Sequence, residues 1–204
     1  MKYCLINKEY TINRRFDSTR EQQHNKICLD TIKRFPENGT NKKTEFAEGK
    51  DMNLTYKKAT IEDIDILTET RIEVLRAANK LPDDTDMNEV KKQSYDYNKK
   101  AICDGTHIAY LIFDKSRFVG AGGVSFFQVM PTYHNPSGKK AYIMNMYTNP
   151  DYRRQGIAYK TLDMLIRDAK SKGITAISLE TTAMGLPLYQ KYGFVKMNNE
   201  MQLP

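Results

Sequence analysis

Apolar residues recur every three or four positions along two stretches in the middle of the chain. Residues 60–78 begin with Thr60 and Asp63, and residues 86–101 begin with an acidic residue followed by Glu89, so each start matches a helix-capping pattern. This period places the apolar side chains on one face of a helix. The pattern therefore predicts two amphipathic helices.

Stretches rich in β-branched and aromatic residues follow. Residues 107–113 and 117–129 are separated only by a polar turn at 114–116, which is typical of an antiparallel hairpin. Glycine inside a strand indicates a bulge or a close backbone approach, and the second strand contains Gly120, Gly122 and Gly123. Residues 131–140 are rich in turn-forming residues, so we expect a loop there.

The next segment changes between the two periods. Residues 141–148 resemble a strand, an amphipathic helix then ends at Gly173, and residues 174–180 resemble a strand again. This order predicts a right-handed crossover between parallel strands. Residues 185–193 predict a short helix and residues 194–203 a final strand. The expected fold class is therefore α/β, with a mixed sheet flanked by helices.

Composition limits the partners of such a fold. The 204 residues are 40% apolar, which is enough for one ordinary domain with an appendage. The formal net charge is +7, but the basic residues are spread along the chain, so we expect no nucleic acid partner. The first ten residues carry charges and no sustained apolar stretch, which argues against a secretory signal or membrane span and favours the cytoplasm. Cysteines and histidines are scattered, so we expect free thiols and no metal site.

The first 51 residues differ from the rest. Ser18 and Glu21 match a capping pattern, and the apolar spacing after them predicts one helix. A polar stretch then resembles a linker. We therefore expect an N-terminal extension over residues 1–51 and a folded domain over residues 52–204, with a start of translation at Met52 as the alternative.

A basic turn connects the strand at 141–148 to the following helix. Arg153 and Arg154 are followed by Gly156 and Ala158. At such a helix start, free amides and the helix dipole favour a phosphate, and glycine lets the backbone approach it closely. The pattern matches neither a nucleotide-hydrolysing loop nor a dinucleotide-binding loop. The alternative is an ordinary solvated helix start.

Two motifs distinguish these alternatives. The stretch "NPDYRRQGIA" resembles the R-x-x-G-x-G/A acetyl-CoA loop of the GCN5-related N-acetyltransferases (GNAT), with Arg153, Gly156 and Ala158 at the defining positions. The stretch "LYQKYGF", residues 188–194, resembles the second signature of the same superfamily. The resemblance covers residues 53–204 in element order, and both motifs are similar to those of a bacterial subgroup whose acceptors are small molecules or unidentified.

The resemblance implies where acetyl-CoA binds. The donor would lie in a splayed gap between the strands at 141–148 and 174–180, with backbone groups of the first strand on the pantetheine arm. Amides of the basic turn would hold the pyrophosphate, and a threonine stands where relatives often carry an asparagine that bonds the pantetheine. The implied cofactor contacts are Met146, Tyr147, Thr148, Arg153, Arg154, Gln155, Gly156, Ile157, Ala158 and Thr182.

The resemblance also implies a direct transfer, in which an uncharged amine attacks the thioester and no acyl-enzyme forms. Tyr189 matches the tyrosine that protonates the leaving thiolate, although without the second signature it would be taken as a core residue. Many relatives place the base on the strand at 141–148, which contains no Asp or Glu here. Glu180 is the nearest carboxylate and the predicted base, with Glu69 and Glu73 as alternatives.

The predicted function is that of an acetyl-CoA-dependent N-acetyltransferase that acts on a primary amine of a small molecule or peptide, without a metal. The alternative is a catalytically silent protein of the same fold that binds or senses acyl-CoA. Acceptor contacts are expected near Leu81, at residues 125–128 and in the loop at 131–140. No membrane partner is expected, and a homodimer is one option for the oligomeric state.

Overall fold

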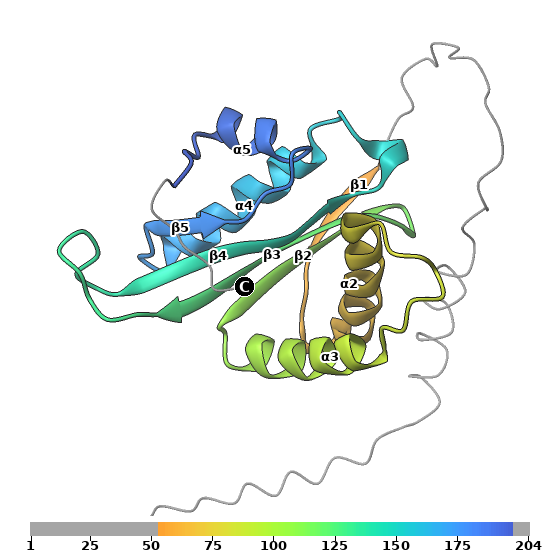
Figure 1. The fold of residues 1–204 in the computed structure, drawn as a ribbon, viewed down its shortest axis with the longest axis horizontal. Coiled ribbons are helices and arrows are strands. Elements are labelled where there is room, and N and C mark those ends of the chain that lie inside the picture. The colour runs from red at the N-terminus through yellow and green to blue at the C-terminus, as the bar shows by residue number, and fades with distance from the viewer. Residues whose placement is uncertain (1–52, 198–204) are drawn as a thin grey trace, which may run out of the picture. The chain divides into compact units, whose positions relative to one another are not determined.

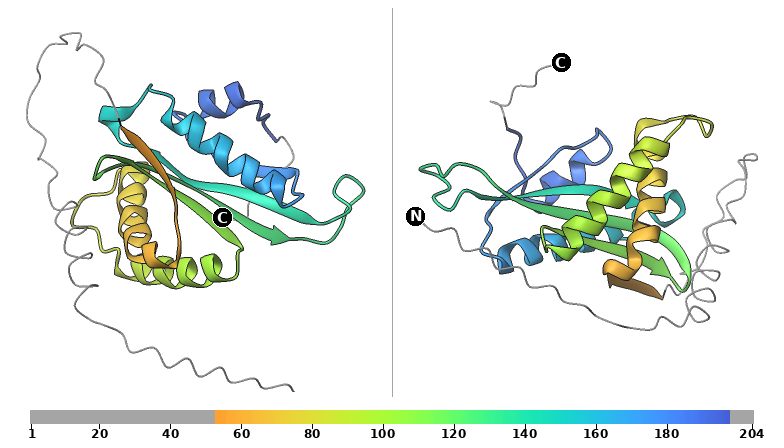
Figure 2. Two further views of the ribbon diagram at one scale, coloured as in Figure 1. Left: turned by 180° about the vertical axis from the view of Figure 1, so that it is seen from behind. Right: turned by 90° about the horizontal axis from the view of Figure 1, so that it is seen from below.

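The structure is a computed structural model that describes residues 53–197 (Figure 1). The helix predicted in the N-terminal extension lies outside the described residues, as does most of the predicted final strand. Within the described range the chain forms one mixed sheet with helices on both of its faces (Figure 2). The expected fold class is confirmed.

Five strands form the sheet, and they lie side by side in the order of the sequence. They are β1 (Leu54–Lys58), β2 (His107–Asp114), β3 (Arg117–Gln128), β4 (Lys139–Thr148) and β5 (Ala176–Leu179). The pairs β1–β2, β2–β3 and β3–β4 are antiparallel, whereas β4 and β5 are parallel. The predicted hairpin and the predicted parallel crossover are therefore both confirmed.

Helices cover the two faces of this sheet (Figures 1 and 2). On one face lie α2 (Ile64–Asn79), preceded by the short 3-10 turn η1 (Ile61–Asp63), and α3 (Asn88–Cys103). On the other face lie α4 (Ile157–Ser171), preceded by the 3-10 turn η2 (Pro150–Tyr152), and α5 (Leu186–Tyr192). None of the helices between residues 53 and 197 is long and apolar enough to cross a lipid bilayer.

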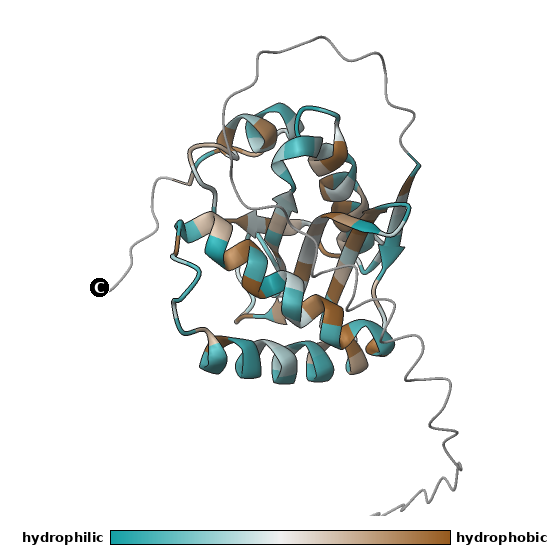
Figure 3. Cartoon of the chain, turned by 90° about the vertical axis from the view of Figure 1, so that its right-hand side faces the viewer, coloured by the Kyte–Doolittle hydropathy of each residue, from teal (hydrophilic) through white to brown (hydrophobic). Residues whose placement is uncertain are grey.

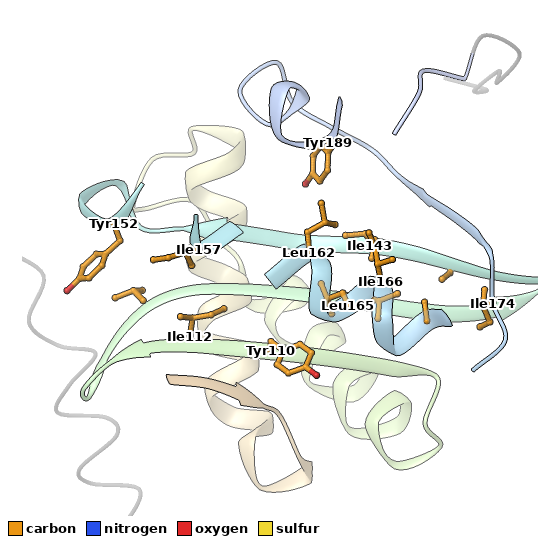
Figure 4. Packing of buried hydrophobic residues seen from close by; sticks show 14 residues of the cluster. Tyr110, Ile112, Ile143, Tyr152, Ile157, Leu162, Leu165, Ile166, Ile174 and Tyr189 are labelled. Carbon is orange, nitrogen blue, oxygen red and sulfur yellow. The ribbon is translucent and has the colours of Figure 1, made fainter. Parts of the chain in front are cut away.

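Each face of the sheet buries its own set of apolar side chains. The larger cluster lies between the sheet and α4, where Leu162 and Leu165 pack with Ile143 of β4 (Figure 4). The smaller cluster lies beneath α2 and contains Leu67, Ala109, Leu111, Phe118 and Ala121. The helix α3 is mainly hydrophilic (Figure 3) and buries only Asn98 and Ala101. The central strands are thus held between two packed layers.

Two elements differ from the sequence prediction. The pattern does not predict β1, because only Leu54 and Tyr56 of this five-residue edge strand are partly buried and the other three residues are exposed. The final strand is wrong for residues 194–197, which pair with no other strand in the described part of the chain. Instead, these residues line an open groove beside β5, which is described below.

The predicted helix starts differ in outcome. The backbone amide and Oγ1 of Thr60 both donate to Asp63 Oδ2, at 2.9 and 3.1 Å, so the first cap forms as expected. The second cap does not form through Glu89. Because α3 begins at Asn88, this residue already lies in the first turn, and its carboxylate accepts from Gln93 one turn later (2.9 Å).

Candidate active site

The sheet opens between β4 and β5. Their parallel pairing ends at Ile143 on β4 and Leu179 on β5, but β4 continues to Thr148. The later part of β4 therefore has no ladder partner on the β5 side within the described sheet. An extended ligand can add to such an edge through main-chain hydrogen bonds. The pairing between β4 and β5 therefore ends where the splayed gap is expected.

A bulge in β4 lies just after the point where the two strands part. Between the residues Met144 and Tyr147, which pair regularly with β3, the residues Asn145 and Met146 face the single Gly122. Asn145 has a φ of 55°, in the left-handed region that an L-residue adopts only at a cost. A Cβ on Gly122 would lie 2.6 Å from Thr161 Cγ2 of α4 and 2.7 Å from Met146 Sδ, so glycine makes room for the side chains that pack over the bulge. Bulges often redirect a side chain next to an active site.

The turn between β4 and α4 leaves amides exposed. Asn149 holds its start by accepting from the Asp151 amide (3.0 Å), and Arg154 and Gly156 have φ values of 66° and 78°. α4 then begins at Ile157, and the first amides of a helix have no partner within it. A Cβ on Gly156 would meet nothing within 4 Å. The turn thus offers an anion free amides, a helix dipole and open space.

Polar side chains flank this turn. Arg153 Nε donates to Thr148 O (3.2 Å), so its side chain lies back over the end of β4. Arg154 and Gln155 are exposed. Thr148 Oγ1 is buried and finds no hydrogen-bond partner among residues 53–197. Because a buried hydroxyl normally has a partner, this one is suited to a ligand that reaches the end of β4.

Tyr189 lies on α5, on the α4 side of the sheet (Figure 4). It is 8% exposed, and its ring packs edge-on against Phe194 with 6.0 Å between the ring centroids. Burial raises the pKa of the Tyr189 phenol, so the hydroxyl keeps its proton. Thr182 fixes the start of α5, because its carbonyl accepts from the amides of Gly185 and Leu186 at 3.0 and 3.1 Å.

A groove of about 640 Å³ runs between α4, β5, α5 and the segment that follows α5. Tyr189 lines it together with Leu179 of β5, Ile166 of α4 and Phe194. The groove follows the outer side of β5, which is the last strand of the described sheet. The groove therefore reaches the Tyr189 ring from the outer side of β5, and no residue of β4 lines it.

The three candidate bases have different surroundings. Glu73 on α2 is partly buried and accepts from the Tyr147 hydroxyl on β4 (3.4 Å). Burial raises the pKa of Glu73, and burial together with Glu73 raises the pKa of Tyr147 to about 12. Glu69 forms an ion pair with Lys91 (2.6 Å). Glu180 lies just after β5 and is exposed. Of the three, Glu73 is the carboxylate that the fold holds against β4.

A polar cluster lies beside the bulge, on the α2 and α3 side of β4. Arg71 Nη1 donates to Asn145 Oδ1 (3.1 Å). Ser125 Oγ lies 2.9 Å from His107 Nδ1 and 2.6 Å from the Tyr97 hydroxyl. Burial, with a smaller effect of the Arg71 charge, lowers the pKa of His107 to about 4, so the imidazole is neutral near pH 7. We call these five residues the α2-side cluster.

Comparison with known proteins identifies the family. The sequence model of the Acetyltransferase (GNAT) family matches residues 75–194, more than half of the chain. A predicted acetyltransferase from Clostridium acetobutylicum, solved with acetyl-CoA, is 30% identical. That match covers 74% of this chain and 96% of the Clostridium chain, with a TM-score of 0.68. The chain belongs to the GNAT acetyltransferase family.

More distant GNAT structures support the fold. A GCN5-related N-acetyltransferase from Ralstonia eutropha is 22% identical, with a TM-score of 0.66, and the match covers 74% of this chain and 98% of the other. Glucosamine-6-phosphate N-acetyltransferase from Arabidopsis thaliana is 15% identical, with a TM-score of 0.54, over 74% of this chain and 99% of that one. At these identities the likeness concerns the fold alone. A search of curated proteins found no match.

The GNAT fold brings most of the predicted donor contacts together. Met146, Tyr147 and Thr148 lie on the open end of β4, and the basic turn follows it directly. The side chains of Ile157 and Met146 pack into the core, so any ligand contact of theirs would be through the backbone. Thr182 is exposed, and its polar groups bond to the start of α5. Among residues 53–197 no three His, Cys, Asp or Glu side chains could jointly hold a metal ion.

Sequence reasoning did not find the α2-side cluster as a unit. Its hydrogen bonds join residues that are far apart, such as Arg71 and Asn145, which are separated by 74 positions. The pair of His107 and Ser125 had a signal, because the two residues face each other across the predicted hairpin. Ser125 also falls within the segment expected to contact the acceptor. Register arguments could therefore have found one pair of the cluster, but not Arg71.

Proposed function

We propose that this GNAT protein transfers the acetyl group of acetyl-CoA directly to a primary amine of a small molecule or peptide. Membership of the family supports acetyl transfer in general. The observation that carries the proposal is that the unpaired end of β4 leads directly into the free amides at the start of α4. Acyl-CoA needs both features, because its pantetheine arm contains amides and its pyrophosphate is negatively charged.

The donor would be bound mainly by main-chain groups. Residues of β4 after Ile143 would bond to the pantetheine arm, and the amides from Arg154 to Ala158 would surround the pyrophosphate. Arg153 and Arg154 would add charge-assisted hydrogen bonds. The acetyl-CoA bound in the Clostridium relative supports this assignment.

The transfer needs no covalent intermediate on the protein. The amine nitrogen bonds to the carbonyl carbon of the thioester, negative charge moves to the carbonyl oxygen, and the carbon–sulfur bond then breaks. A main-chain amide of the bulged β4 would stabilise that oxygen. Tyr189 would give its proton to the leaving thiolate and regain one from solvent, since its raised pKa keeps the phenol protonated until then.

The attacking amine must also lose a proton. We assign this proton to Glu73, because Tyr147 holds its carboxylate against β4 and its raised pKa brings it closer to neutral pH. Glu180, which the sequence favours, is the second candidate, since it follows the β5 side of the gap. The pH profiles of Glu73→Gln and Glu180→Gln distinguish the two.

Calorimetric titration with acetyl-CoA, run beside a thiol-release assay over a panel of amines and peptides, tests the proposal. Binding together with release for at least one amine is the expected result. Binding without release from any amine would instead support a catalytically silent acyl-CoA-binding protein. Absence of binding would overturn the assignment of the turn before α4.

A further inference from the structure

Arg71 is a partly buried cation without a counterion in the described structure. The one hydrogen bond of its side chain to residues 53–197 is that from Nη1 to Asn145 Oδ1, and the side chain forms no ion pair with any of them. Its partial burial holds the charge of Arg71 partly out of water, which lowers the pKa of the guanidinium. A desolvated charge is costly to keep unless a partner compensates it. Most of the guanidinium donors are thus available to a ligand.

The groups around Arg71 do not neutralise it. The other side chains of the α2-side cluster carry no charge near pH 7, including His107. Neither acidic residue two positions away on α2 forms an ion pair with Arg71, because Glu69 pairs with a lysine of α3, and Glu73, which keeps its charge, accepts a hydrogen bond from a tyrosine of β4. The cluster therefore carries one positive charge, on one guanidinium group.

The cluster lies where an acceptor must approach. Asn145, which holds Arg71, is two residues past Ile143, the last residue of β4 that pairs with β5. In the proposed function the thioester lies along β4 in this gap. A group bound to Arg71 would then lie close to the reacting carbon, on the face of β4 opposite to α4. Hydroxyl groups of Tyr97 and Ser125 lie in the same cluster and can add neutral hydrogen bonds.

We propose that Arg71 binds a carboxylate of the acceptor, so that the acceptors are small amino carboxylic acids. This inference rests on the proposed function and names the substrate class of the same site. A guanidinium pairs with a planar carboxylate through two parallel hydrogen bonds. One positive charge matches one carboxylate but only half of a phosphate dianion, and it repels a polycationic acceptor such as an aminoglycoside.

The test compares each amino acid with its own carboxamide as the acceptor, in the thiol-release assay with saturating acetyl-CoA. The wild-type chain is expected to prefer the acid in kcat/KM by about 10- to 100-fold, the range of a charge-assisted pair. Arg71→Gln is expected to remove most of this preference, and Arg71→Lys, which keeps the charge but not the fork, is expected to retain part of it. The ratio of acid to carboxamide is the readout, because a general loss of activity lowers both rates.

Arg167→Gln is the matched control. It removes an exposed arginine from α4, where the side chain pairs with Asp163 (2.7 Å), on the face of the sheet away from the cluster. The control is expected to keep the wild-type ratio. If circular dichroism shows that Arg71→Gln is unfolded, Arg71→Lys takes its place in the comparison, with a ratio below the wild-type value expected.

Three results would overturn the inference. The first is that the wild-type chain uses acids and carboxamides equally well. The second is that the preference for the acid survives unchanged in both Arg71 variants. The third is that no amino acid is acetylated at all. Calorimetry with acetyl-CoA separates this inference from the proposed function. With acetyl-CoA bound and other amines acetylated, such results refute only the carboxylate site, whereas absence of acetyl-CoA binding refutes the proposed function itself.

Discussion

The backbone at Gly156 allows a matched test of the donor site. Gly156 has a φ of 78°, and a Cβ there would meet nothing within 4 Å. Gly173, at the other end of α4, has a φ of 73° and is equally open. Alanine at either position therefore adds left-handed strain without a clash, about 1–2 kcal/mol. Gly156→Ala and Gly173→Ala are thus matched in their effect on the free energy of unfolding and differ in their place on α4.

Each variant is expected to lower the melting temperature by about 2–4 °C for each kcal/mol of strain, as measured by scanning calorimetry. Only Gly156→Ala is expected to weaken the binding of acetyl-CoA, by about 10-fold in Kd. Relief of its strain would turn the amides before α4 away from the pyrophosphate, at a cost of about one hydrogen bond. Titration calorimetry measures this difference. Equal Kd values for the two variants would refute the pyrophosphate site, and a loss of stability in only one of them would refute the strain argument.

Three further predictions follow from the surroundings of single side chains. Tyr189→Phe is expected to lower kcat by about 100-fold. The Kd of acetyl-CoA and the stability are expected not to change, because the Tyr189 hydroxyl has no partner among residues 53–197. An unchanged kcat in the thiol-release assay would contradict its role as the acid. In the wild-type chain kcat/KM is expected to rise with pH through the raised pKa of Glu73, because only the deprotonated carboxylate accepts the proton of the amine. This rise in the pH profile is expected to vanish in Glu73→Gln but to persist in Glu180→Gln. The free energy of unfolding is expected to fall by up to about 3 kcal/mol as the pH drops from 6.5 to about 4, because His107 becomes protonated in the unfolded chain but not in the folded chain. Urea titrations at several pH values measure this. If the unfolding free energy of His107→Gln falls with pH as steeply as that of the wild-type chain, His107 is not the origin.

Local patterns predict most of the elements but little of their contacts. The helices α2 and α4 follow from apolar spacing, because each buries one face against the sheet. The edge strand β1 has two partly buried positions, Leu54 and Tyr56, which is too few to produce a recognisable period. Its pairing with β2 depends on residues more than 50 positions away, which no local window contains.

The two halves of the candidate site differ in the same way. Most of the donor half, apart from Thr182 and Tyr189, is contiguous in sequence from Met146 to Ala158, and its turn requires a left-handed residue that glycine supplies, so a motif can describe it. The other half depends on the bulge at Asn145. The three glycines of β3 indicate a bulge or close approach, but they do not show that the left-handed residue lies on β4 or that Arg71 reaches it. These contacts arise only when the sheet and α2 are assembled.

The bulged strand β4 has two faces with separate neighbours. Met146 packs toward α4 with the donor half, whereas Tyr147 and Asn145 face α2. Since β4 alone is common to both halves, a laboratory library restricted to α2, α3 and the facing residues of β3 can vary one half while the other is inherited unchanged. The same separation offers evolution a simple route, in which new acceptors are acquired by changes on two helices while the machinery for a single shared donor is preserved.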